Sequence, residues 1–132
     1  MTIKKQITIC KSKTDFKIYP ESKNEIGLWV AHTPCFVASV DTVEDIVNKA
    51  LQYSNSGLQA TDDTAKNVLK ELHIKNWNIL YKTYKIISLS LTDKNIIITP
   101  YIYTQKGVFP DMKAKSIFDV CNFKNALEQL LK

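Results

Sequence analysis

Cys35 and the two histidines, His32 and His73, are the residues whose chemistry could support nucleophilic catalysis. A cysteine becomes a strong nucleophile when a neighbouring cation or a helix N-terminus lowers the pKa of its thiol. Cys35 lies inside an apolar run, where burial raises that pKa instead. We therefore interpret Cys35 as a packed thiol, His32 as a residue at a strand end, and His73 as the residue that closes a helix.

Number and spacing exclude the other kinds of chemical site. Cys10, Cys35 and Cys121 lie far apart and are odd in number, so they build neither a zinc site nor a disulfide framework. Three isolated glycines supply neither a phosphate-binding loop nor a nucleophile elbow. We expect no catalytic residue, no cofactor and no metal ligand, and we expect the protein not to be an enzyme. Reduced cysteines favour a cytoplasmic location, and no signal peptide or membrane span is visible.

The charges are distributed unevenly along the chain. The formal net charge is +5, from 18 basic and 13 acidic residues, and every basic residue is lysine. Proteins that read phosphates and bases rely on the planar, bidentate arginine side chain. Its absence argues against a nucleic-acid surface, although a small Lys-rich nucleic-acid-associated regulatory protein stays as the alternative function.

Residues 41–63, the acidic island, reverse this balance because they contain five acids and one lysine. Carboxylates at helix starts are commonly capping groups, but an acidic surface also suits a basic partner. The predicted partner-binding acids are Glu44, Asp45, Asp62 and Asp63.

Tyr101 and Tyr103 are the aromatic binding candidates, near the end of a predicted hairpin. On one face of a strand they could stack on bases, as aromatic residues do in single-strand-binding sheets. Such residues more often pack a helix against a sheet or contribute to a protein interface. We therefore include both tyrosines in the predicted partner-binding set.

A single α+β domain over residues 1–132, with a mainly antiparallel sheet and amphipathic helices packed against it, must position these groups. Alternation of apolar and polar residues predicts its strands. A hairpin is expected around Thr92-Asp93-Lys94, and loops are expected at 105–107 and 109–111. The predicted strands are Ile3–Cys10, Phe16–Tyr19 stopped by Pro20, Leu28–Ala31 and Cys35–Val40 (or one strand bent at Pro34), Lys85–Leu91, Asn95–Tyr103 and Ile117–Val120.

Apolar residues three and four positions apart predict the helices. Asp41 or Thr42 is expected to cap the first helix, with Glu44 or Asp45 returning a bond, and the helix should end at Asn55-Ser56-Gly57. The loop Asn55–Thr61 should be exposed. The later helices are expected from Asp62 or Asp63 to Leu72, over Trp77–Tyr84 after Asn76 (where a strand is the alternative), and from Asn122 through Leu131.

The run Phe36-Val37-Ala38-Ser39-Val40-Asp41-Thr42-Val43-Glu44-Asp45, followed by Ala50-Leu51-Gln52-Tyr53-Ser54, resembles immunity proteins of bacterial contact-dependent growth inhibition (CdiI-type) systems. The family pattern is a strand, an acidic cap, a helix ending in Ala-Leu-x-x-Ser, a variable helical stretch, a hairpin and a second strand–helix unit. Phe36–Leu51 and Ile117–Leu131 are the two strand–helix units here. Asn55 stands where the family usually has arginine, and the helix lacks the family's early glycine.

The resemblance implies a bacterial cytoplasmic protein that binds one cognate toxin domain, commonly a nuclease, and neutralises it without an active site of its own. Immunity proteins against nucleases are often acidic, because a nuclease presents a basic groove. This chain is basic, so we expect either that its acidic island docks the toxin or that the toxin face is not strongly basic.

Overall fold

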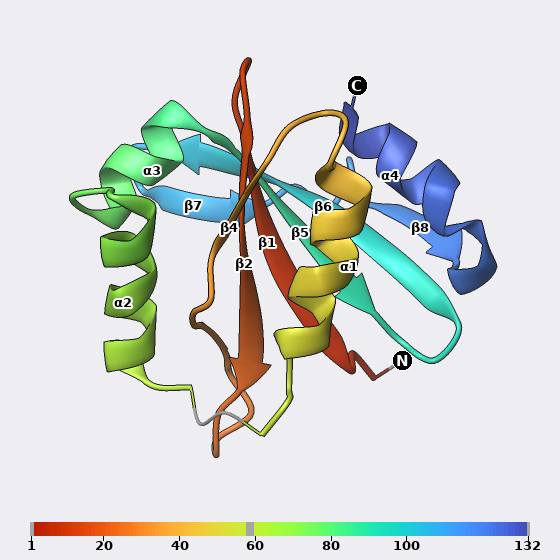
Figure 1. The fold of residues 1–132 in the computed structure, drawn as a ribbon, viewed down its shortest axis with the longest axis horizontal. Helices are drawn as coiled ribbons and strands as arrows, with labels where there is room; N and C mark the ends of the chain where they lie inside the picture. The colour runs from red at the N-terminus through yellow and green to blue at the C-terminus, as the bar shows by residue number, and fades with distance from the viewer. Residues whose placement is uncertain (1, 58–59, 132) are drawn as a thin grey trace.

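The fold is an antiparallel sheet with helices on both faces, which confirms the expected α+β class (Figure 1). The structure is a computed structural model that describes residues 2–57 and 60–131. Over those residues it contains eight strands, four α-helices and one 3-10 turn. The main strand order is β3-β2-β1-β5-β6-β7, while β4 also pairs with β2 and β8 with β6. Because β1 pairs with β5, the centre of the sheet joins the two halves of the chain.

In the first half of the sheet, β1 and β2 form a hairpin and two short strands continue it. β4 pairs with the beginning of β2 and β3 with its end, both on the edge away from β1. The cis peptide Thr33–Pro34 lies between these short strands. The strands are β1 (Lys5–Lys11), β2 (Phe16–Lys23), β3 (Trp29–Ala31) and β4 (Phe36–Ala38).

The expectation that Pro20 stops the second strand is wrong, since Pro20 lies inside β2 opposite Ile7. Proline lacks an amide N–H and normally interrupts a central strand. Here it faces the gap between β3 and β4, and its carbonyl accepts a hydrogen bond of 3.0 Å from the His32 amide. The gap removes the need for a donor at this position, so the strand continues to Lys23.

The second half of the sheet contains the predicted hairpin. The chain turns at residues 105 and 106, as expected, but the loops expected at Gly107 and at 109–110 are wrong because these residues belong to β7, which pairs with β6. Ile102 lies opposite Phe109 in this added hairpin. The strands are β5 (Lys85–Leu91), β6 (Asn95–Thr104), β7 (Gly107–Pro110) and β8 (Ser116–Asp119).

The four helices begin close to their expected positions, but their caps differ. Asn76 caps its helix as predicted, accepting from the Ile79 amide at 2.9 Å. Thr42 occupies the first N-cap without a capping bond, because its hydroxyl accepts from the Ser39 amide at 3.0 Å instead. Asp119, not Asn122, caps the 3-10 turn that leads into the last helix. The elements are α1 (Val43–Tyr53), α2 (Asp62–Leu72), α3 (Trp77–Thr83), the 3-10 turn (Val120–Asn122) and α4 (Phe123–Leu131).

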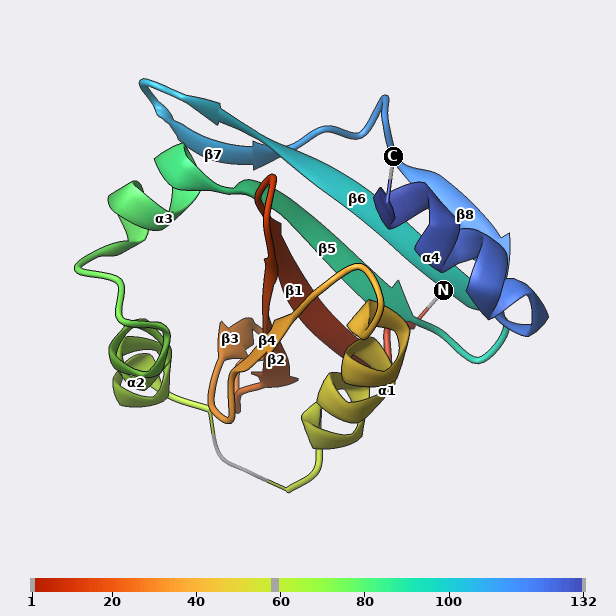
Figure 2. The same ribbon diagram turned by 45° about the horizontal axis from the view of Figure 1, so that its top comes forward.

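Each face of the sheet has its own hydrophobic core. α1 and α4 pack on the first face, where Ile9 and Leu89 are fully buried. α2 and α3 pack on the second face, where Cys10 and Leu80 are fully buried. Figure 2 shows the two helix pairs on opposite sides of the central strands β1 and β5. The second face also carries the polar side chains of β1 and β5, so it is the less apolar one.

The two strand–helix units noticed in the sequence are parts of a larger internal repeat. A shift of eighty positions converts the β1–β2 pairing into the β5–β6 pairing, the β2–β4 pairing into the β6–β8 pairing, and α1 into α4. The apolar residues at several equivalent positions pack in the same core. Equivalent pairs are Ile7 and Ile87, Ile18 and Ile98, Pro20 and Pro100, Gly27 and Gly107, and Val47 and Leu127.

Candidate partner-binding site

The predicted acidic residues are all exposed, but they do not form one cluster. Glu44 and Asp45 lie in the first turn of α1, and Asp62 and Asp63 lie in the first turn of α2. In Figure 1 these two turns lie far apart, in the upper half right of centre for α1 and at the lower left for α2. Each pair therefore presents a separate acidic surface to a partner.

Of the two acidic surfaces, the one at the start of α2 borders a hollow. Asp62 and Glu25 line the same hollow of about 300 Å³, between the α2 N-terminus and the turn that joins β2 to β3. Ile26, at the tip of that turn, has 78% of its side-chain surface exposed. Of the predicted exposed loop, Leu58 and Gln59 lie outside the described residues, and residues 55–57 and 61 are exposed. The expectation is wrong for Ala60, which is buried. The carboxylates of Glu25 and Asp62 and the exposed Ile26 therefore form one acidic surface at the start of α2.

Tyr101 and Tyr103 both lie on the second face of the sheet, two positions apart on β6. Tyr101 is half-buried against the core that α2 and α3 cover, whereas Tyr103 is 40% exposed. Val108 of β7 lies opposite Tyr103 in the ladder. Tyr101 thus packs against the core while part of its side chain stays exposed, and Tyr103 lies on the same face with more of its side chain in solvent.

Beside Tyr101 is a hollow of about 180 Å³ that contains a carboxylate, Glu21. The strands β1, β2, β5, β6 and β7 form its walls on the sheet, and Tyr81 of α3 closes it from the helix layer. One carboxylate oxygen, Oε1, accepts a hydrogen bond from the Thr8 hydroxyl at 2.7 Å and another from the side-chain amide of Gln6 at 3.3 Å. The lining residues are Thr8, Tyr19, Glu21, Tyr81, Ile86, Tyr101 and Val108.

The electrostatics of this hollow are those of a partly desolvated anion. Burial raises the pKa of Glu21, and the hydrogen bonds from Thr8 and Gln6 lower it by less. Burial also raises the pKa of the Tyr81 and Tyr101 hydroxyls, and the Glu21 charge raises it further. At neutral pH both tyrosines are therefore neutral rings around a carboxylate.

Cys35, the candidate nucleophile, and the two histidines, His32 and His73, each have a structural role. Burial and the Glu71 carboxylate raise the pKa of the Cys35 thiol to about 12, so it is a thiol at neutral pH. His32 is fully buried, and Ser22 bonds one of its ring nitrogens at 2.7 Å. His73 adopts a left-handed conformation at the end of α2, where its amide bonds the Lys70 carbonyl. No three His, Cys, Asp or Glu side chains of residues 2–57 and 60–131 gather closely enough to hold a metal ion.

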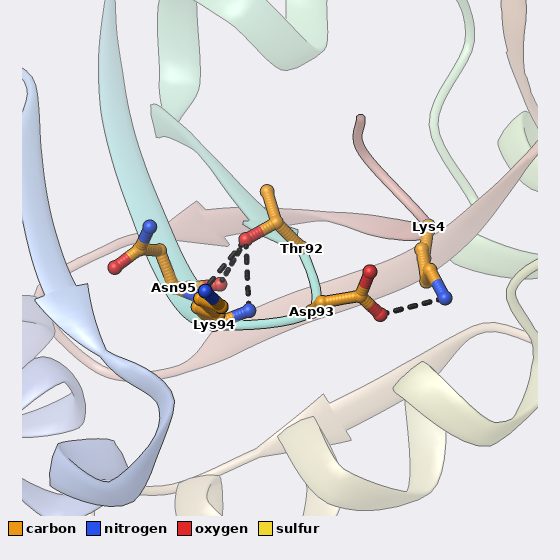
Figure 3. Close-up of polar contacts among 5 residues, drawn as sticks. All are labelled: Lys4, Thr92, Asp93, Lys94 and Asn95. Atoms are coloured by element: carbon orange, nitrogen blue, oxygen red, sulfur yellow. Dashed lines mark hydrogen bonds and ion pairs between the residues drawn. The ribbon is translucent and has the colours of Figure 1, made fainter. Parts of the chain in front are cut away.

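The turn between β5 and β6 contains another hollow, of about 250 Å³ (Figure 3). The Thr92 hydroxyl accepts from the amides of Lys94 and Asn95, and the Lys4 ammonium pairs with Asp93 at 2.6 Å. Both charged side chains are largely exposed, and such pairs contribute about 0–1 kcal/mol at most. The equivalent turn of the first half uses Ser12 in the same way as Thr92. This hollow therefore belongs to a structural turn that both halves share.

Sequence analysis missed Glu21, Tyr19 and Tyr81. One signal was available: Tyr19 and Glu21 alternate around Pro20, so a strand through the proline places both on one face. The expected stop at Pro20 concealed that alternation. Tyr81 reaches the hollow from a helix far along the sequence, and no local pattern predicts that meeting.

No family model matches this chain, and no curated protein matches it. Its fold is similar to that of a protein of unknown function from Neisseria meningitidis, with a TM-score of 0.63 and 14% sequence identity over 92% of this chain and 90% of that one. It is also similar to a chain of the CdiA-CT/CdiI toxin and immunity complex from Yersinia pseudotuberculosis. That likeness has a TM-score of 0.56 and 13% identity, over 90% of this chain and 89% of that one.

The fold resembles a toxin–immunity structure. At 13% and 14% identity the likeness concerns the arrangement of elements and not individual site residues. It extends over about nine-tenths of the chain, so it includes both halves of the internal repeat. In the described part of the chain, no helix has the length and apolar character needed to cross a bilayer.

Proposed function

We propose that this protein is a cytoplasmic immunity protein that binds a cognate toxin domain and neutralises it by covering a surface the toxin needs. The observation that carries the proposal is the likeness of the whole fold to a chain of a toxin and immunity complex. The resemblance of the Phe36–Ser54 run to immunity proteins supports it from the sequence. We further propose that the protein has no catalytic activity, because inhibition by binding requires none.

The described surface offers features that suit a basic partner. The first turn of α2 combines Asp62 and Asp63 with the neighbouring Glu25, and the second sheet face combines Tyr103 with the Glu21 hollow. Exposed charges at the rim of an interface mainly raise the association rate, whereas desolvated charge pairs contribute to the lifetime of the complex. We propose that the acids steer the toxin domain and that the aromatic face holds it.

A growth assay tests the proposed function. Bacteria would express, from an inducible promoter, a candidate toxin domain taken from the C-terminus of a protein encoded next to this gene, with or without this chain in the cytoplasm. We expect the toxin domain alone to arrest growth and co-expression of this chain to restore it. An unrelated immunity protein at the same expression level is the control and should give no protection.

Failure of the folded protein to protect the cells or to co-purify with the toxin domain would contradict the proposal. A gel shift separates the Lys-rich alternative from it. Binding to DNA or RNA that weakens steeply with salt, without binding to the toxin domain, would favour a nucleic-acid-associated protein.

A further inference from the structure

The hollow beside Glu21 has a lining suited to a cation. Tyr19, Tyr81 and Tyr101 are among its lining residues, and the negative face of an aromatic ring attracts an ammonium or guanidinium group within about 6 Å. A volume of about 180 Å³ is below the roughly 300–1,000 Å³ of pockets for drug-sized ligands. The size therefore suits the end of one long side chain.

Glu21 has unused acceptor capacity towards this hollow. Both hydrogen bonds to its side chain reach Oε1, and Oε2 accepts none from the described residues. No side-chain oxygen of the described residues is both fully buried and without a partner, so Oε2 remains accessible. A carboxylate can accept several hydrogen bonds, and a charged donor makes the strongest of them.

Residues 2–57 and 60–131 do not supply a cation to this carboxylate. The chain contains 18 lysines, yet none of those in the described ranges forms an ion pair with Glu21. The nearest lysines on the same strand make other contacts: Lys17 lies over the Tyr84 ring and Lys23 over the Trp29 ring. Removing a carboxylate from water costs free energy unless a cation or hydrogen-bond donors compensate its charge. A cation from a partner would meet that requirement.

The internal repeat places this hollow at the junction of the two halves. Glu21 and Tyr101 occupy equivalent positions, and both line it. The inserted helix α3 contributes Tyr81 to the lining, and β7 contributes Val108, whose ladder partner Tyr103 is 40% exposed. A side chain can therefore enter from the surface that Tyr103 shares.

We propose that the hollow formed by Glu21, Tyr19, Tyr81 and Tyr101 receives one basic side chain, lysine or arginine, of the toxin domain. Oε2 of Glu21 accepts a charged hydrogen bond from its nitrogen, and the tyrosine rings contact its apolar stem and cation. This inference rests on the proposed function for the identity of the partner. The cation-binding property of the hollow is independent of it.

The first experiment uses n-butylammonium and n-butylguanidinium, the analogues of lysine and arginine side chains, and needs no toxin. Each is titrated into the full protein while NMR follows the ring protons of Tyr81 and Tyr101. We expect saturable shifts with at least one of the two cations, and the stronger one identifies the preferred side chain. n-Butanol, a neutral analogue, should give no saturable shift.

Glu21→Gln removes the charge and keeps an acceptor for Thr8, so it should fold and lose the saturable shifts. Glu128→Gln, a change at an exposed acid of α4, is the matched control and should keep them. If neither cation gives saturable shifts in the wild type, or if Glu21→Gln retains them in full, the cation pocket is overturned.

The second experiment measures toxin binding by the same variants. We expect Glu21→Gln to weaken the affinity by at least roughly tenfold, mainly through faster dissociation, and Glu128→Gln to leave it unchanged. Strong toxin binding that Glu21→Gln does not alter would overturn the role of the hollow and leave the proposed function intact. Cation binding by a protein that binds no toxin domain would overturn the proposed function and the assigned occupant, but not the pocket.

Discussion

Ser54 explains in atomic terms why the helix motif Ala-Leu-x-x-Ser ends in serine. It is fully buried at the end of α1. Its hydroxyl donates to the Glu21 carbonyl at 2.7 Å and accepts from the Gln6 amide at 2.8 Å, so one side chain joins the helix to both β1 and β2. The next residue, Asn55, uses its side chain to bond the backbone of Lys4 and Lys23.

Ser54→Ala should therefore lower the free energy of unfolding by about 1–3 kcal/mol, because a buried amide and a buried carbonyl each lose a partner. Ser56→Ala is the control: Ser56 is exposed, and the loss should stay within about 0.5 kcal/mol. Urea denaturation of the three proteins measures both values. Equal stability of Ser54→Ala and the wild type would show that the motif serine has no structural role.

His32 is a pH-sensitive part of the same junction. Its Nδ1 donates to the Thr33 carbonyl at 2.8 Å, so the neutral ring leaves Nε2 to accept from Ser22, whose hydroxyl in turn accepts from the Asn55 amide. Burial lowers the pKa of His32 below 6.5. The unfolded chain then binds the proton more tightly, so His32 contributes stability that is complete above pH 6.5 and is lost as pH falls below it.

We expect the free energy of unfolding of the wild type, minus that of His32→Gln, to decrease as pH falls from about 7.5 to 5. The difference between the two proteins is needed because burial raises the pKa of Glu21 and gives it the opposite pH dependence. Urea denaturation at each pH provides the values. A difference that is constant with pH would show that His32 does not titrate on unfolding.

At the scale of elements, lysines at the two ends of β1 secure the ends of the helices on the first face. The Lys5 ammonium donates to the Leu51 carbonyl of α1 at 3.0 Å, and the Lys11 ammonium to the Leu130 carbonyl of α4 at 2.8 Å. Cations at helix C-termini interact favourably with the helix dipole and the free carbonyls. Part of the basic charge of the chain therefore has a structural role, and that role does not depend on a partner.

The exposed acids at the helix starts are expected to steer the toxin domain. Reversing Glu44, Asp62 and Asp63 to lysine should slow association with it and reduce the salt dependence of the association rate, because opposite charges at an interface rim accelerate encounter. Stopped-flow measurements at two salt concentrations test this. The dissociation rate should change little.

The internal repeat supplies a matched control. Lys124 of α4 occupies the position equivalent to Glu44 of α1 and is also exposed. Lys124→Glu should leave the association rate unchanged or raise it slightly. If Lys124→Glu slows association more than the acid reversals do, the docking face is basic and the acidic assignment is wrong.

Much of the element order could be predicted because it depends on local signals. The alternation of Ile87, Leu89 and Leu91 predicts β5, and Asn76 before an apolar run predicts α3. β7 was missed because its residues form a strand only through pairing with β6. The acids could be assigned to the surface, but the distance between Glu44 and Asp62 in the fold depends on the antiparallel course of α1 and α2, which no local pattern encodes.

At the scale of the whole molecule, the repeat explains both the symmetry of the fold and where that symmetry ends. The halves share one core under α1 and α4, built from equivalent residues such as Ile9 and Leu89. The segment that contains α2 and α3 lies between the two halves in the sequence. It covers only part of the second face of the sheet. The Glu21 hollow and the surface of Tyr103 lie at the border of that cover. The unique part of the fold thus coincides with the face proposed for the partner.

We propose that this protein inhibits a toxin domain by binding it directly. The measurement that tests it most directly is a titration of the purified cognate toxin domain with this protein, following the toxin's own activity in vitro. We predict that activity falls linearly to the background level at one equivalent of inhibitor, and that heat-denatured protein has no effect. Toxin activity that persists in the presence of an excess of folded protein would contradict the account.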